Sequence, residues 1–62
     1  MINVVVTGCT GRMGQIISKL VIENDNTNLV GAIEIEGHEL IGTDIGTFLG
    51  YDKLGVKIAA NG

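Results

Sequence analysis

Residues 4–14 read Val4-Val5-Val6-Thr7-Gly8-Cys9-Thr10-Gly11-Arg12-Met13-Gly14, and this stretch decides the fold. A β-branched run stops at a glycine, two more glycines follow at intervals of three, and a helical pattern begins after them. This order predicts a strand, a tight turn and a helix. Gly8 permits the turn, because glycine tolerates positive φ. Gly14 lets the helix lie close against the strand.

The same junction has the chemistry of an anion site. Gly11 has no side chain, so phosphates can approach the backbone, and the start of the helix presents unpaired N–H groups and the positive end of its dipole. An acid, Glu34, follows the apolar run Leu29–Ile33. Strand, glycine turn, helix and an acid about 20 residues further on together predict dinucleotide binding. Glu34 then accepts hydrogen bonds from the adenosine ribose hydroxyls. Alone, three glycines fit an ordinary surface turn.

Four other loop residues are candidates for contact with the cofactor. Cys9 has no His or acid in a recognisable relation to it, so we expect a small residue packed under the loop rather than a nucleophile. Thr10 is expected to cap the helix with its hydroxyl. Arg12 is a cation where the helix dipole disfavours one, so it either faces a bound phosphate or is simply solvated. Met13 is either a ligand contact or, more commonly at such spacing, a core residue.

A helix is predicted from Arg12 to about Glu23. One side of it is an apolar stripe, expected to face the core, and the other side is polar. The stripe is Met13, Ile16, Ile17, Leu20 and Val21, and the polar side is Gln15, Ser18, Lys19 and Glu23. Lys19 and Glu23 form an i, i+4 pair. The run Asn24-Asp25-Asn26-Thr27-Asn28 ends the helix.

The remaining elements complete a parallel sheet. Ile2–Val6, closed by Thr7, is apolar on both faces, as in a central covered strand, and Leu29–Ile33 is a second strand. Val56, Ile58 and Ala60 alternate, which predicts a short third strand at a sheet edge. The fold class is α/β: a Rossmann-like βαβ unit with a third short strand, an incomplete doubly wound parallel sheet. Between these strands, Asp44 caps a helical turn containing Ile45 and Phe48, and His38 is expected to be a solvated surface histidine.

Composition narrows the function classes. The chain has 62 residues, ten glycines, one cysteine and a net charge of −3. An acidic chain whose only aromatic residues are Phe48 and Tyr51 lacks a nucleic-acid footprint. No apolar run approaches the ~20 residues of a membrane span, and no Cys/His cluster offers a metal site. The start has no signal-peptide pattern, and the single cysteine agrees with a reducing compartment, so we expect a cytoplasmic protein.

The glycine loop resembles the opening of the dihydrodipicolinate reductases (4-hydroxy-tetrahydrodipicolinate reductases), whose loop typically reads Gly-x-x-Gly-Arg-Met-Gly. Gly31-Ala32-Ile33-Glu34 looks like that family's second strand and acid. Leu40-Ile41-Gly42-Thr43-Asp44-Ile45-Gly46 resembles its Gly-x-Asp-x-Gly connection, and Leu54-Gly55-Val56 the lead into its third strand. The likeness spans residues 1–62, which we expect to form the amino-terminal portion of a dinucleotide-binding domain.

The resemblance implies reduction of 4-hydroxy-tetrahydrodipicolinate with NADH or NADPH in diaminopimelate and lysine biosynthesis, by a homo-oligomer, a tetramer in the family. Gly8, Cys9, Thr10, Gly11, Arg12, Met13 and Gly14 would wrap the pyrophosphate and Glu34 would hold the ribose. Members that bind NADPH well often carry a basic residue after the acid, where this chain has Ile35, so NADH is favoured. The family's paired histidines and lysine have no counterpart here, because His38 does not match that motif. The chain alone is therefore expected to be inactive.

Two other readings stay open at this stage. Thr7-Gly8-Cys9-Thr10-Gly11 also fits the start of extended short-chain dehydrogenases and epimerases, although those usually continue with bulky apolar residues. A non-enzymatic nucleotide-binding module is the third reading. A P-loop is poorly supported, because Gln15 and Ile16 replace the lysine and hydroxyl residue that should follow its last glycine.

Overall fold

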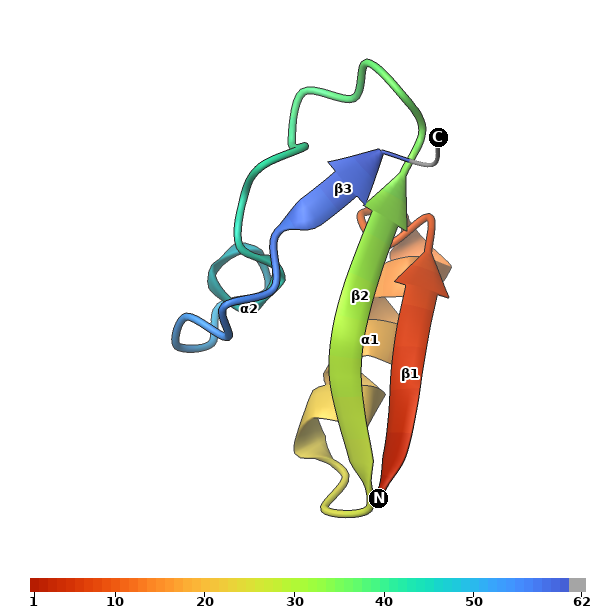
Figure 1. Ribbon diagram of the computed structural model, residues 1–62, viewed down its shortest axis with the longest axis vertical. Coiled ribbons are helices and arrows are strands. Elements are labelled where there is room, and N and C mark those ends of the chain that lie inside the picture. Colours follow the sequence, from red (N-terminus) through yellow and green to blue (C-terminus); the bar gives the residue numbers. More distant parts are fainter. Residues whose placement is uncertain (61–62) are drawn as a thin grey trace.

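The structure, a computed structural model, describes residues 1–60. Its elements follow the order β1 (Ile2–Thr7), α1 (Arg12–Glu23), β2 (Thr27–Glu34), α2 (Ile45–Phe48) and β3 (Ile58–Ala60). The strands form one parallel sheet in the order β1-β2-β3, with α1 behind β1 and β2 (Figure 1). The predicted α/β class and βαβ unit are confirmed. The helix has the predicted bounds, whereas β2 extends two residues earlier and one residue later than the predicted run.

The parallel pairing places the ends of β1 and β2 at one edge of the sheet. Ile2 pairs with Thr27 and Thr7 pairs with Ile33, with a register irregularity between Val4 and Val5. Both carboxyl ends therefore lie at the upper edge in Figure 1, beside the turn that enters α1. The glycine loop and Glu34 are brought to the same edge by this register.

A small core lies between α1, the sheet and the long connection 35–57. Its buried members are Val6, Cys9, Leu29, Ala32, Ile45 and Ile58. Ile45 is the first residue of α2. Its N–H donates to the Val56 carbonyl at 2.9 Å, which joins the connection to the chain entering β3. The connection is thus anchored to the core at Ile45, whereas other parts of it, such as Ile35 and Leu54, are exposed.

The predicted orientation of α1 is wrong for four of the five residues of the apolar stripe, because only Val21 is partly buried against the core. The fully buried side of the helix is made of small residues, Gly14 and Ser18, while Met13 is 68% and Leu20 64% exposed. Ile16 and Ile17 are also exposed. The reason is steric: small residues let the helix backbone approach the sheet, and the larger apolar side chains, offset by about 100° per residue, turn away. Glu23 accepts a hydrogen bond from the Tyr51 hydroxyl, so its partner is this tyrosine rather than Lys19.

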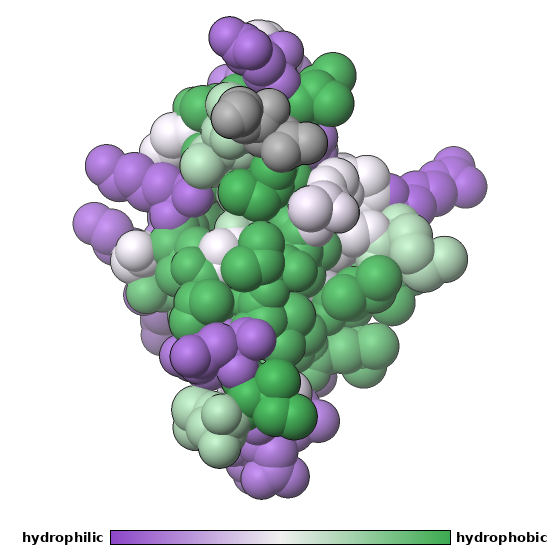
Figure 2. Space-filling model, turned by 45° about the vertical axis from the view of Figure 1, so that its right-hand side comes forward, coloured by the Kyte–Doolittle hydropathy of each residue, from purple (hydrophilic) through white to green (hydrophobic). Residues whose placement is uncertain are grey.

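The face of the sheet opposite α1 is uncovered within residues 1–60. Val5 on β1 is 56% exposed and Val30 on β2 is 45% exposed. Figure 2, which brings the β1 side of Figure 1 forward, shows hydrophobic residues across the middle of this face and hydrophilic ones toward its ends. The expectation that β1 is covered on both faces is therefore not met by the described chain, where β1 is an edge strand. No helix of residues 1–60 is long and apolar enough to cross a membrane.

Candidate functional site

The glycine loop has the geometry that its sequence predicts. Gly8 has a φ of +63°, which only glycine adopts readily. A Cβ on Gly14 would lie 2.0 Å from the Gly8 carbonyl oxygen, so this position admits no side chain without displacing the loop. A Cβ on Gly11 would meet only the Gly8 oxygen, at 3.5 Å, an ordinary contact. Gly8 and Gly14 therefore have structural roles, whereas Gly11 leaves space above the loop.

The start of α1 leaves backbone donors available. The first intrahelical bond runs from the Gln15 N–H to the Gly11 carbonyl at 2.9 Å, so the N–H groups of Arg12, Met13 and Gly14 precede the helical ladder. Gly11 is the N-cap residue, and no side chain caps the helix. The expectation that Thr10 caps it is wrong, because the Thr10 hydroxyl bonds to Glu34 instead. The helix start thus combines open N–H donors with the positive end of the dipole.

Cys9 lies beneath the loop, as expected. Its side chain is fully buried among core residues, and its N–H donates to the Ile33 carbonyl at 3.3 Å. Burial raises the pKa of the Cys9 thiol, and the negative charge of Glu34 raises it further. A buried thiol held protonated is not a nucleophile. Cys9 fixes the loop to the end of β2, and its N–H is already taken.

Glu34 is bonded to the loop across 24 residues of sequence. Its side chain is only 7% exposed, and its Oε2 accepts hydrogen bonds from the Thr10 N–H at 2.8 Å and from the Thr10 hydroxyl. Its Oε1 accepts a longer bond, 3.3 Å, from the Ile35 N–H. The hydroxyl and the N–H of Thr10 lower the pKa of Glu34, since both stabilise the ionised form. These hydrogen bonds favour the ionised carboxylate at the sheet edge beside the glycine loop.

His38 also belongs to this cluster, which makes the expectation of a solvated surface histidine wrong. The ring is half-buried, with Nε2 lying 3.2 Å from the Thr10 hydroxyl and Nδ1 accepting from the Leu40 N–H at 3.1 Å. Gln15 also joins the cluster, although no pattern in the sequence marks it: its side-chain amide donates to the Thr10 carbonyl at 2.7 Å. For His38, the one available signal was its position four residues after Glu34, close enough to return to the strand end.

Arg12 and Met13 flank the open donors with exposed side chains. Met13, at 68% exposure, is not the core residue that its spacing favoured. Arg12 is exposed as well. Both side chains are accessible to a ligand bound at the start of the helix.

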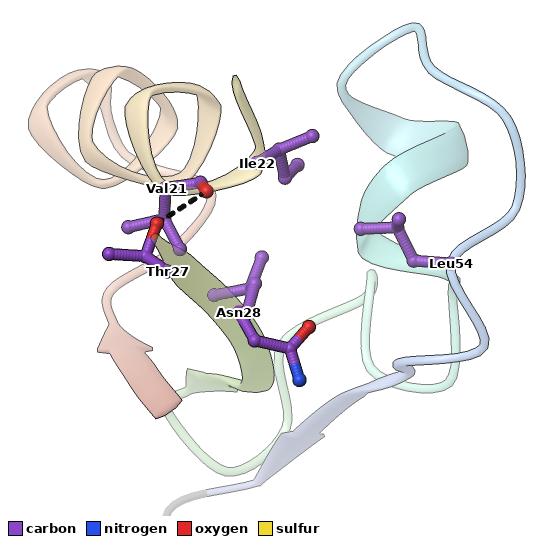
Figure 3. Close-up of a pocket in the computed structure, with 6 residues that line it drawn as sticks. Val21, Ile22, Thr27, Asn28 and Leu54 are labelled. Atoms are coloured by element: carbon purple, nitrogen blue, oxygen red, sulfur yellow. Dashed lines mark hydrogen bonds between the residues drawn. The ribbon is translucent and has the colours of Figure 1, made fainter. Parts of the chain in front are cut away.

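A pocket within the described residues lies away from the glycine loop. Its volume is about 110 Å³, and it is bounded by the end of α1, the start of β2 and Leu54 (Figure 3). Val21, Ile22, Thr27 and Asn28 line it, at the opposite end of the sheet from the glycine loop. Small-molecule sites usually occupy about 300–1,000 Å³, so we regard this pocket as a packing gap. No three potential metal ligands meet within residues 1–60.

A parallel β-α-β turn with a glycine-lined helix start and an acid ending the second strand defines a Rossmann-like unit. Residues 2–62 match the family model described as "Dihydrodipicolinate reductase, N-terminus", and the chain belongs to this family. This membership decides against the dehydrogenase and epimerase reading of the loop.

Three relatives illustrate the similarity, each named 4-hydroxy-tetrahydrodipicolinate reductase. The chain is 46% identical to the protein of Ruegeria sp. (strain TM1040) over 56 residues, covering 90% of this chain and 21% of the relative. It is 48% identical to the Methanopyrus kandleri protein over 59 residues, 95% and 22% of the two chains. It is 43% identical to the Methanococcus vannielii protein over 61 residues, which cover 98% of this chain and 23% of the relative. The chain therefore spans about a fifth of the length of the curated relatives it matches.

Proposed function

We propose that residues 1–62 form the amino-terminal portion of a dinucleotide-binding domain and bind the pyrophosphate and adenosine ribose of NADH or NADPH. The observation that carries this proposal is the meeting of open helix N–H groups with an ionised carboxylate at one sheet edge. Gly8, Gly11, Gly14 and the N–H groups of Arg12 and Met13 are assigned to the pyrophosphate, with Cys9 and Thr10 shaping the loop from below and beside it. Glu34 is assigned to the ribose.

NADH is the proposed preference. A carboxylate at the ribose accepts hydrogen bonds from its hydroxyls and repels a 2′-phosphate. The next residue, Ile35, is apolar and 70% exposed, so it offers no cation to a phosphate there. Arg12 is the cation on the loop, and it is assigned to the pyrophosphate.

For the whole protein we propose NAD(P)H-dependent reduction of 4-hydroxy-tetrahydrodipicolinate in diaminopimelate and lysine biosynthesis, in the cytoplasm and as a homo-oligomer. The support is the family membership of this segment. No catalytic residue is assigned to residues 1–62, so the isolated chain should show no reductase activity. A non-enzymatic nucleotide-binding module is the alternative, and reductase activity of a longer protein carrying this segment would exclude it.

A substitution at Gly11 separates binding from folding. Gly11 has φ −73° and ψ 169°, backbone angles open to any residue, and space for a Cβ. Aspartate is among the best N-cap residues, so Gly11→Asp should preserve or raise the melting temperature. Its carboxylate would occupy the open N–H groups and repel a pyrophosphate. NADH affinity should fall at least about 100-fold, which corresponds to a loss of roughly 2.8 kcal/mol of binding free energy.

The measurement is NADH fluorescence titration of the purified protein together with its thermal melt. Gly11→Ala is the uncharged comparison and should lower the affinity less than Gly11→Asp. Unchanged NADH affinity in a folded Gly11→Asp variant would show that the cofactor does not bind at this loop.

A further inference from the structure

The two oxygens of Glu34 are unequally available to a ligand. Oε2 already accepts two hydrogen bonds, both from Thr10, one through its N–H at 2.8 Å and one through its hydroxyl. Oε1 accepts only the 3.3 Å bond from the Ile35 N–H. A carboxylate oxygen has about two lone-pair directions, so Oε2 is saturated and Oε1 retains capacity.

The direction of the hydrogen bonds shows how Thr10 is held. The Leu40 N–H donates to Nδ1 of His38, so Nδ1 carries no hydrogen and the neutral ring carries its hydrogen on Nε2. Nε2–H can therefore donate to the Thr10 oxygen at 3.2 Å. The Thr10 hydroxyl is left to direct its own hydrogen to Glu34. The resulting chain runs from His38 through Thr10 to Glu34.

We propose that Thr10, oriented by His38, is a specificity-positioning residue: it fixes Glu34 so that one oxygen faces the ribose and the carboxylate cannot turn away from a 2′-phosphate. This inference rests on the proposed binding of a dinucleotide at the loop. Its physical basis is the difference between a fixed and a mobile charge. A mobile carboxylate rotates or takes up a proton when a phosphate approaches, whereas Glu34 is held by Thr10 on one side and is 7% exposed.

The lowered pKa of Glu34 agrees with this role. Thr10 supplies its two largest causes, and both favour the ionised form. A carboxylate that resists protonation keeps its repulsion for a 2′-phosphate at neutral pH. Discrimination between the two cofactors thus depends on a residue that itself need not touch the phosphate.

The test compares Thr10→Val with Thr10→Ser in the purified protein that carries this sequence. Valine preserves the shape of threonine but removes the hydroxyl, and serine restores it. Dissociation constants for NADH and NADPH are measured by fluorescence titration, and the ratio of the two is the readout. In Thr10→Val, the ratio of the NADPH dissociation constant to the NADH dissociation constant should fall at least about 5-fold, because hydrogen bonds to charged groups are among the stronger ones. Thr10→Ser should restore the ratio to within about 2-fold of the unsubstituted protein.

Two further variants separate positioning from stability. His38→Phe removes the donor behind Thr10 and should shift the ratio in the same direction by a smaller factor. Thr27→Val removes a hydroxyl that donates to the Val21 carbonyl at 2.8 Å, at the other end of the sheet, so it should lower the melting temperature and leave the ratio unchanged. A carbon-detected NMR titration supplies a readout without cofactor: the pKa of Glu34 should rise in Thr10→Val.

The outcomes distinguish this inference from the function beneath it. If the unsubstituted protein binds NADH but Thr10→Val leaves both the cofactor ratio and the pKa of Glu34 unchanged, the positioning role is overturned and dinucleotide binding stands. If the unsubstituted protein binds neither cofactor, the proposed function fails and the inference fails with it.

Discussion

Glu34 and Asp44 are two carboxylates that both accept backbone N–H groups, yet they differ in what they leave free. Asp44 accepts from the N–H groups of Thr47, Leu54, Gly55 and Val56 at 2.8–3.1 Å, and from the Thr47 hydroxyl at 3.3 Å. These donors use both of its oxygens. Glu34 has one saturated oxygen and one nearly free.

The difference agrees with a structural role for Asp44 and with the ribose-binding role that we propose for Glu34. Asp44 joins the start of α2 to the chain that leads into β3, within a connection that contains little regular structure. Glu34 joins the loop to the end of β2, and its Oε1 accepts only one hydrogen bond, of 3.3 Å, from the Ile35 N–H. Number and direction of donors, rather than residue type, indicate which acid a ligand can use.

Of the substitutions at these two carboxylates, Asp44→Asn should have the largest effect, and this effect is on stability. An amide retains one oxygen but presents its NH₂ group to backbone donors, so two or more N–H groups lose their partner. The melting temperature should fall by roughly 10 °C in a chain of this size. Circular dichroism melts measure it, with Asp25→Asn, an exposed acid in the α1–β2 turn, as the matched control. A melt equal to that of the control would show that the Asp44 network is not structural.

Glu34→Gln should have the second-largest effect, and it should fall on binding rather than folding. Losing the charge weakens the bonds to the ribose hydroxyls, so NADH affinity should drop about 10-fold, the usual range for one hydrogen bond to a charged group. The repulsion of a 2′-phosphate disappears as well, so NADPH affinity should fall less or rise. Glu36→Gln, an exposed acid two residues further on, should change neither. Equal losses in both glutamine variants would contradict the assigned role of Glu34.

Acidification should remove the contribution of Asp44 to the stability of the fold. Partial burial raises the pKa of Asp44, but N–H donors led by Thr47, Leu54 and Gly55 outweigh it and lower the pKa to about 2. Because the folded pKa lies below that of the unfolded chain, near 3.9, this stabilisation is complete above about pH 4 and is lost as the pH falls through 2. Melting temperatures between pH 5 and 2 should show this decline, and Asp44→Asn should flatten it. The lowered pKa of Glu34 acts in the same direction, so some slope should persist.

Local sequence signals predicted the parts of this molecule that depend on neighbouring residues. The bounds of α1, the turn at Gly8, the buried Cys9 and the capping by Asp44 all follow from propensity and spacing. Glu34 was placed at the correct edge because strand ends align in a parallel sheet.

The predictions that were wrong concern features that depend on contacts between residues far apart in the sequence. The rotation of α1 could not be predicted, since a stripe that includes Met13 and Leu20 looks like a core-facing side, whereas close packing selected Gly14 and Ser18. The Thr10 hydroxyl was assigned to its own helix because no pattern shows that Glu34 competes for it. The path of the 35–57 connection brings His38 next to Thr10, and this connection has no periodic pattern from which its path could be predicted.

Ser18 extends the comparison to a buried polar group with no partner at all. It is fully buried between α1 and the sheet, and among residues 1–60 its hydroxyl makes no hydrogen bond. An unpaired buried hydroxyl costs about 1–3 kcal/mol, and alanine also has the higher helix propensity. Ser18→Ala should therefore stabilise the fold by about 1 kcal/mol, which is smaller than the loss expected from Asp44→Asn and opposite in sign. Ser18→Thr keeps the hydroxyl and adds a methyl group to a packed position, so it should destabilise. A lower melting temperature for Ser18→Ala would mean that the hydroxyl has a partner, and the contrast with Asp44 would then rest on Glu34 alone.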